Sequence, residues 1–128
     1  MIMNEGLADI ESRRWIAKAE SDLKHAKNSF EVGDYDWVLL ASQQAGEKAL
    51  KAVCIKKGIG LTKTHDLSSL ARKLKAPKEI IIEAGLLNPF YTISRYPDLE
   101  FFSEEEIKNA AIDALNAAGK VVEWCKKQ

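Results

Sequence analysis

The sequence predicts an all-α fold, an up-and-down four-helix bundle with an additional short helix. Apolar residues recur three or four positions apart through several long segments, which is the period of an amphipathic helix, and no segment is a convincing strand. Short connections rich in glycine, proline and capping residues separate these segments and favour antiparallel neighbours. The 128 residues suit one domain, residues 1–128, which is long enough to bury a core.

The first predicted helix covers residues 9–32. One face carries apolar residues at helical spacing: Trp15, Ala19, Leu23, Ala26 and Phe30. Gly33 is expected to end this helix, because glycine adopts the left-handed conformation without steric cost. Asp34 follows at once and is predicted to cap the second helix.

The second predicted helix covers residues 35–57 and is terminated by Gly58 and Gly60. A short third helix fits residues 66–74. Pro77 is predicted to open a fourth, because a proline in the first turn loses no hydrogen bond.

The fourth helix is expected to break at Asn88-Pro89, where a second cap is followed by a first-turn proline. The piece after the break then carries Tyr91 and Arg95. A last helix is predicted over residues 103–126, and it opens with a capping box. That box consists of Ser103 and Glu106. The apolar residues of this helix form a heptad-like seam: Ile107, Ala111, Ala114, Ala118, Val121 and Cys125.

The second predicted helix carries a stripe of small residues: Ala41, Ala45, Ala49 and Ala52. Such a stripe lets another helix approach closely. Polar residues follow beside it: Gln43, Gln44, Glu47, Lys48 and Lys51. One interpretation is a core stripe next to a solvated face, with Glu47 and Lys51 as a weak helical ion pair. The other is a polar face that meets a partner or a phosphate. The stripe and the seam of the last helix together predict a homodimer.

The stretch YTISRYPD, residues 91–98, places Arg95 between two tyrosines and shortly before an aspartate. In a structural interpretation, Arg95 pairs with Asp98 at a helix end and adds about 0–1 kcal/mol of stability. In a binding interpretation, the guanidinium holds a phosphate while a tyrosine ring stacks on a base. We predict a ligand-binding site, to which the second helix contributes if it lines the same groove. The predicted binding residues are Arg95, Tyr91, Tyr96, Asp98, His65, Lys48 and Lys51.

Motif chemistry alone does not support an enzyme. The sequence has no glycine-rich phosphate loop, no paired-carboxylate motif and no metal-ligand spacing. His25 is expected on the surface of the first helix, whereas His65 precedes a helix start and is a capping or packing residue or a proton carrier. Cys54 and Cys125 are isolated. We therefore predict no catalytic residue, no cofactor, no metal site and no disulfide.

The composition is typical of a soluble globular protein, with 46% hydrophobic and 30% charged residues. The formal net charge is zero, so nucleic-acid binding would require a local basic patch. The longest apolar runs are too short to span a membrane, and the N-terminal residues lack the apolar core of a signal peptide. We expect a cytoplasmic protein.

Three stretches resemble successive signatures of the HEPN family, whose name stands for higher eukaryotes and prokaryotes nucleotide-binding. They are WIAKAESDLKHA at residues 15–26, QQAGEKALKAVCIKKG with THDLSSL within residues 43–70, and YTISRYPD. The resemblance implies an all-α bundle that is usually dimeric. It also implies a minimal nucleotidyltransferase as partner, often in pairs that look like toxin–antitoxin modules. Some members of the family are RNases, and others bind RNA or a nucleotide without catalysis.

The sequence departs from the nuclease members of that family at one position. Those members place a histidine four to six residues after an arginine on the same helix surface. Here no histidine follows Arg95, and none occurs anywhere after His65. The resemblance therefore favours a non-catalytic module that binds a nucleotide or RNA. The alternatives are a metal-independent RNase toxin with an atypical site formed by Arg95 and His65, and a purely structural dimerisation module.

Overall fold

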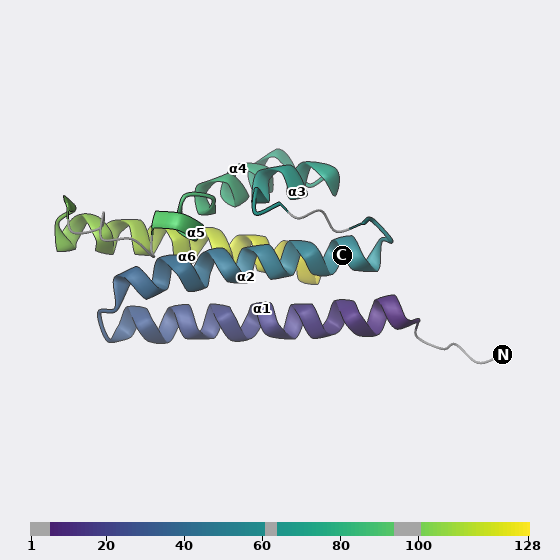
Figure 1. Cartoon of the computed structure of the whole chain (residues 1–128), viewed down its shortest axis with the longest axis horizontal. Coiled ribbons are helices and arrows are strands. Elements are labelled where there is room, and N and C mark those ends of the chain that lie inside the picture. Colours follow the sequence, from purple (N-terminus) through teal and green to yellow (C-terminus); the bar gives the residue numbers. More distant parts are fainter. Residues whose placement is uncertain (1–5, 61–63, 94–100) are drawn as a thin grey trace.

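The computed structural model describes residues 6–60, 64–93 and 101–128, and these residues form an all-α bundle as predicted (Figure 1). The helical segments are α1 (Leu7–Glu31), α2 (Tyr35–Lys56), α3 (Leu67–Lys73), α4 (Lys78–Leu87), α5 (Phe90–Ile93) and α6 (Glu104–Lys126). α1 and α2 form a long hairpin, and α6 runs beside α2. The short helices α3, α4 and α5 cover the side of α2 and α6 that faces away from α1 (Figure 1).

α2 is the central helix, because it contacts each of the other five. Leu39 and Leu50 of α2 are fully buried, and Leu67 of α3 and Leu87 of α4 pack into the same core. Gly46 allows this packing. A Cβ atom at Gly46 would lie 2.7 Å from Cδ1 of Leu87, so a larger residue would force the Leu87 side chain to shift.

The two small-residue stripes lie inside the core of this single chain. Three alanines of the α2 stripe and five residues of the α6 seam are buried: Ala45, Ala49, Ala52, Ala111, Ala114, Ala118, Val121 and Cys125. Ala41 and Ile107 are half-buried and pack against them. These stripes are therefore not the exposed apolar surfaces on which the homodimer prediction rested. Dimerisation stays a prediction without that support.

Most helix ends follow the sequence signals, although Pro77 stands at the N-cap of α4 and not in its first turn. Gly33 and Gly58 have φ of 81° and 68° and end α1 and α2 as predicted. The capping box of Ser103 and Glu106 at the start of α6 is confirmed. Asp34 occupies the N-cap position of α2, but its side chain accepts no capping hydrogen bond. Its backbone, at φ −84° and ψ 67°, lies outside the extended conformation that a capping side chain normally requires.

The break at Asn88-Pro89 is confirmed, since α4 ends one residue before it and α5 begins one residue after it. The side chain of Asn88 has a different role from the predicted one, because the start of α3 lies beside the break. Its Oδ1 accepts a hydrogen bond from the backbone N–H of Leu67 at 2.8 Å, and its Nδ2 donates to Asp66 at 2.9 Å. Asn88 thus caps α3, not the piece that follows it in sequence.

Asp66 is the N-cap of α3 and collects several hydrogen bonds. The hydroxyl groups of Ser68 and Ser69 donate to its carboxylate at 2.7 and 2.8 Å, and the backbone N–H of Ser69 donates at 3.3 Å. These bonds, those from Ser68 and Ser69 foremost, hold the pKa of Asp66 well below its ordinary value of 3.8. The ionised carboxylate is therefore the form that stabilises this junction.

Asp66→Asn should remove a pH dependence while keeping a good N-cap residue. A lowered folded-state pKa contributes stability that is fully present above the ordinary value and is lost as the pH falls below it. Wild-type protein should therefore lose more stability than Asp66→Asn between about pH 5 and about pH 2.5. Asp66→Ala should cost about 1 kcal/mol at neutral pH. Urea unfolding at each pH measures these differences, and parallel curves for wild type and Asp66→Asn would contradict the assignment.

The described part of the chain has neither a membrane-spanning helix nor a cluster of metal ligands, and its two cysteines are buried. There, none of the helices combines the length and the apolar character needed to span a bilayer. Within the same residues, no group of three His, Cys, Asp or Glu side chains is placed to hold a metal ion. Cys54 and Cys125 are buried free thiols, and burial raises the pKa of both. They are therefore poor nucleophiles at neutral pH.

Candidate functional site

Glu47 of α2 is a buried carboxylate at the centre of a polar cluster, and its residue surface is only 5% exposed. Nδ1 of His65 lies 2.6 Å and Nε2 of Gln43 lies 3.4 Å from its Oε1. Nζ of Lys51 lies 3.5 Å from its Oε2. Because an ionised carboxylate only accepts hydrogen bonds, His65 donates from Nδ1. These three donors satisfy the condition for keeping a carboxylate charged inside a protein.

His65 connects this cluster to α5. It lies just before the cap of α3, and its ring stacks on Tyr91 with centroids 4.0 Å apart and an interplanar angle of 17°. The His65 side chain is 45% exposed. With Nδ1 bound to Glu47, Nε2 has no hydrogen-bond partner among the residues that the structure describes. The arrangement fixes the ring by one edge and one face.

The two predicted lysines of α2 differ in their surroundings. Lys51 belongs to the cluster through Glu47, and its ammonium also lies 6.0 Å from the centre of the Trp15 ring on α1. Lys48 instead pairs with Asp22 of α1, whose carboxylate also lies 4.0 Å from Lys18. The charge of Lys48 is thus compensated on the α1 side of α2, and the structure does not bring it to His65.

The structure therefore brings together three of the seven predicted binding residues: His65 and Lys51 contact Glu47, and Tyr91 stacks on His65. The other predicted residues besides Lys48 lie outside the described residues: Arg95, Tyr96 and Asp98. The proposed pairing of Arg95 with Asp98 lies outside them too. His25 is exposed on α1, as predicted.

The interpretation of the polar face of α2 as solvated is wrong for Gln43 and Glu47. Gln43 is completely buried, and its Oε1 accepts a hydrogen bond from Gln44 at 2.7 Å. The sequence did contain a signal for this. Positions 43, 47, 50 and 54 follow the spacing of one helix row, and this row includes the apolar residues Leu50 and Cys54. Two polar residues in such a row predict a buried polar network, and Glu47 is the residue of this cluster that the predicted binding site did not include.

The comparisons with known proteins agree with this fold. A family model of the HEPN domain matches residues 12–128. TT1696 from Thermus thermophilus is 28% identical with a TM-score of 0.79, and the match covers 91% of this chain and 96% of that one. The archaeal HEPN homologue ST0689 is 32% identical with a TM-score of 0.76 at the same coverages. The HEPN domain protein tm0613 from Thermotoga maritima is 27% identical with a TM-score of 0.74, over 89% of this chain and 95% of that one.

No curated protein matches the sequence significantly. The family model nevertheless covers nearly the whole chain, and solved HEPN structures share its fold along almost their full length. The three sequence signatures lie on α1, on α2 with the start of α3, and on α5 with the residues after it. The chain belongs to the HEPN domain family.

Proposed function

We propose that this chain is a non-catalytic HEPN-type module that binds a nucleotide or RNA. In this proposal it acts in the cytoplasm, as a homodimer, with a minimal nucleotidyltransferase in a toxin–antitoxin-like pair. Membership of the HEPN family supports the class of partner and ligand. The absence of a histidine after Arg95 in the sequence supports the lack of catalysis.

The observation that carries the binding proposal is the stack of His65 on Tyr91, held in place by Glu47. A half-exposed imidazole fixed in this way loses little conformational entropy when it binds a ligand. Arg95 follows Tyr91 by four residues in the sequence. A guanidinium suits a phosphate, while aromatic faces and ring nitrogens suit a base. This combination of side chains supports a ligand that carries both a phosphate and a base.

His65→Asn should weaken ligand binding by roughly tenfold, because it removes the ring and Nε2 while keeping a donor for Glu47. His25→Asn is the matched control, since His25 is exposed on α1 and lies outside the cluster. The measurement is calorimetric titration with adenosine and guanosine phosphates, with a short single-stranded RNA, and with any nucleotidyltransferase encoded by an adjacent reading frame. If wild type bound none of these, or if both variants bound equally well, the proposal would be rejected.

The bond between Glu47 and His65 also gives specific support to the RNase alternative. A carboxylate that orients a histidine through Nδ1 prepares Nε2 for general acid–base catalysis. The same single-stranded RNA tests this possibility in metal-free buffer. We expect it to stay intact. Cleavage by wild type that disappears in folded His65→Asn but persists in His25→Asn would favour the nuclease.

A further inference from the structure

A pocket of about 740 Å³ lies on α6 and is also lined by residues of α1 and α4. Most of its surface is apolar, and its volume lies in the range typical of sites for small organic molecules. We call it the α6 groove and define it by its apolar wall, which consists of Ile80, Leu115, Gly119 and Trp124. His65 does not line it, so the α6 groove is separate from the site proposed above.

Gly119 is the unusual residue of this wall. It lies inside α6, where glycine is less favourable than alanine because it gains no packing and loses more backbone entropy. Gly33 and Gly58 have positive φ, whereas Gly119 does not. Gly46 is held close to Leu87, whereas a Cβ atom at Gly119 would meet nothing within 4 Å. Neither the backbone nor the packing of this chain therefore requires a glycine at position 119.

The wall around Gly119 suits an aromatic ring. Trp124 and Leu115 are half-buried and pack against the core, so each has part of its surface exposed. An aromatic ring that packs against an indole gains more than its buried area alone provides. The absence of a side chain at Gly119 also allows a flat group to approach the helix backbone closely. The wall thus offers apolar contact along with space above the helix.

The charged residues at the α6 groove have both signs. Nζ of Lys120 lies 3.4 Å from a carboxylate oxygen of Glu83, so this lysine is paired. The other charged lining residues are lysines and glutamates in equal number: Lys27, Lys127, Glu79 and Glu123. Because neither sign predominates among these side chains, the groove favours a ligand by its apolar surface and not by a net charge.

We propose that the α6 groove binds a flat, uncharged aromatic molecule, with its ring over Gly119 and against Trp124 and Leu115. The ring removes apolar surface of the groove from water, which is the main source of affinity in such a site. The space above Gly119, which the chain itself leaves unfilled, accommodates the ring without movement of the helix.

N-Phenyl-1-naphthylamine is a suitable probe, because it is uncharged and aromatic and its fluorescence rises in apolar sites. Wild type should bind it at one saturable site. Gly119→Leu should weaken this binding by roughly tenfold or more, since the new side chain occupies the groove. The same variant should raise the urea midpoint, because leucine favours a helix more than glycine does. Asn116→Trp should also weaken binding, because Asn116 is an exposed lining residue at which a large ring covers the groove.

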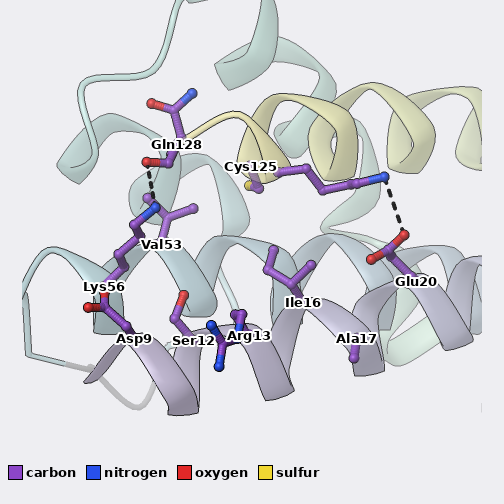
Figure 2. Close-up of a pocket in the computed structure, with 11 residues that line it drawn as sticks. Asp9, Ser12, Arg13, Ile16, Ala17, Glu20, Val53, Lys56, Cys125 and Gln128 are labelled. Atoms are coloured by element: carbon purple, nitrogen blue, oxygen red, sulfur yellow. Dashed lines mark hydrogen bonds and ion pairs between the residues drawn. The ribbon is translucent and has the colours of Figure 1, made fainter. Parts of the chain in front are cut away.

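A second pocket, of about 560 Å³, provides the matched control (Figure 2). It lies between α1 and the last turns of α2 and α6, and Ala17 lines it at an exposed position outside the α6 groove. Ala17→Leu and His65→Asn should therefore bind the probe as wild type does. Weaker binding by Ala17→Leu would place the probe in the second pocket, weaker binding by His65→Asn would place it at the proposed nucleotide or RNA site, and either result would overturn the proposal.

Displacement tests the class of ligand. The flat ring of 2-naphthol should displace the probe, and its saturated, non-planar counterpart decahydro-2-naphthol should do so roughly two- to tenfold less well, the range expected for an aromatic pair. Anilinonaphthalene sulfonate, an anionic relative of the probe, should bind no more tightly than the probe. Equal displacement by the two alcohols, tighter binding of the anion, or wild-type binding by Gly119→Leu would each contradict the proposal. So would the absence of saturable binding by folded wild-type protein.

Discussion

Glu47→Ala is expected to lower the free energy of unfolding by about 3 kcal/mol, the largest stability effect that we expect from a single polar side chain of this protein. Removing one partner from a buried ion pair costs about 3–5 kcal/mol, because it leaves the other charge uncompensated. Here the variant leaves Lys51, Gln43 and His65 without their common acceptor. The lower end of the range applies, since His65 is half-exposed and can bind water instead.

Two further variants serve as comparisons, one that keeps the shape of Glu47 without its charge and one that breaks an exposed ion pair. Glu47→Gln keeps the volume and one acceptor oxygen, so it should cost about 1–2 kcal/mol, the difference between charged and neutral hydrogen bonds. Glu20→Ala breaks an ion pair with Lys126 in which both side chains are nearly half-exposed, and it should cost about 1 kcal/mol at most. Urea unfolding followed by circular dichroism measures all three. Equal losses for Glu47→Ala and Glu20→Ala would mean that the buried network adds no special stability.

The helices of this fold could be predicted because their signals are local. Gly33 and Gly58 end helices through their own backbone conformation, and Ser103 caps α6 through a residue three positions away. Asn88 shows where local reasoning fails. Its type and position predicted a break correctly, but its side chain caps a helix that begins about twenty residues earlier in the sequence. That partner is fixed by the packing of α3 against α4, which the sequence does not reveal directly.

The candidate site could be predicted only in part for the same reason. The signature residues His65 and Tyr91 were selected from short sequence stretches, and the fold does bring their rings together. For Glu47, which binds His65, the sequence left two interpretations open, a solvated ion pair with Lys51 and a polar face that meets a partner or a phosphate. Helix periodicity alone does not show which neighbours cover a face. Lys48 lies one position further along α2 and turns to Asp22 on α1. Because consecutive side chains of a helix lie on different faces, Glu47 and Lys48 contact different neighbours.

Arg95→Ala is expected to weaken ligand or partner binding by about 1.5–3 kcal/mol, the value of a hydrogen bond to a charged group. In dissociation constants this is a loss of roughly tenfold to more than a hundredfold. The expectation rests on the sequence, since Arg95 lies outside the described residues and four positions after Tyr91. Thermal stability should hardly change. Arg72→Ala is the control, because Arg72 is an exposed arginine of α3 away from the cluster.

Arg95→Lys and Asp98→Ala decide between the two interpretations of YTISRYPD. Lysine keeps the positive charge but loses the planar fork that binds a phosphate through two hydrogen bonds. If Arg95 binds ligand, Arg95→Lys should therefore bind nearly as poorly as Arg95→Ala in calorimetric titrations with nucleotides, RNA and any adjacent nucleotidyltransferase. If Arg95 only pairs with Asp98, both alanine variants should cost the same stability, about 1 kcal/mol at most, and binding should not change. Equal binding by wild type and both Arg95 variants would assign this arginine to the structure of the helix end, because a bidentate contact cannot survive both substitutions.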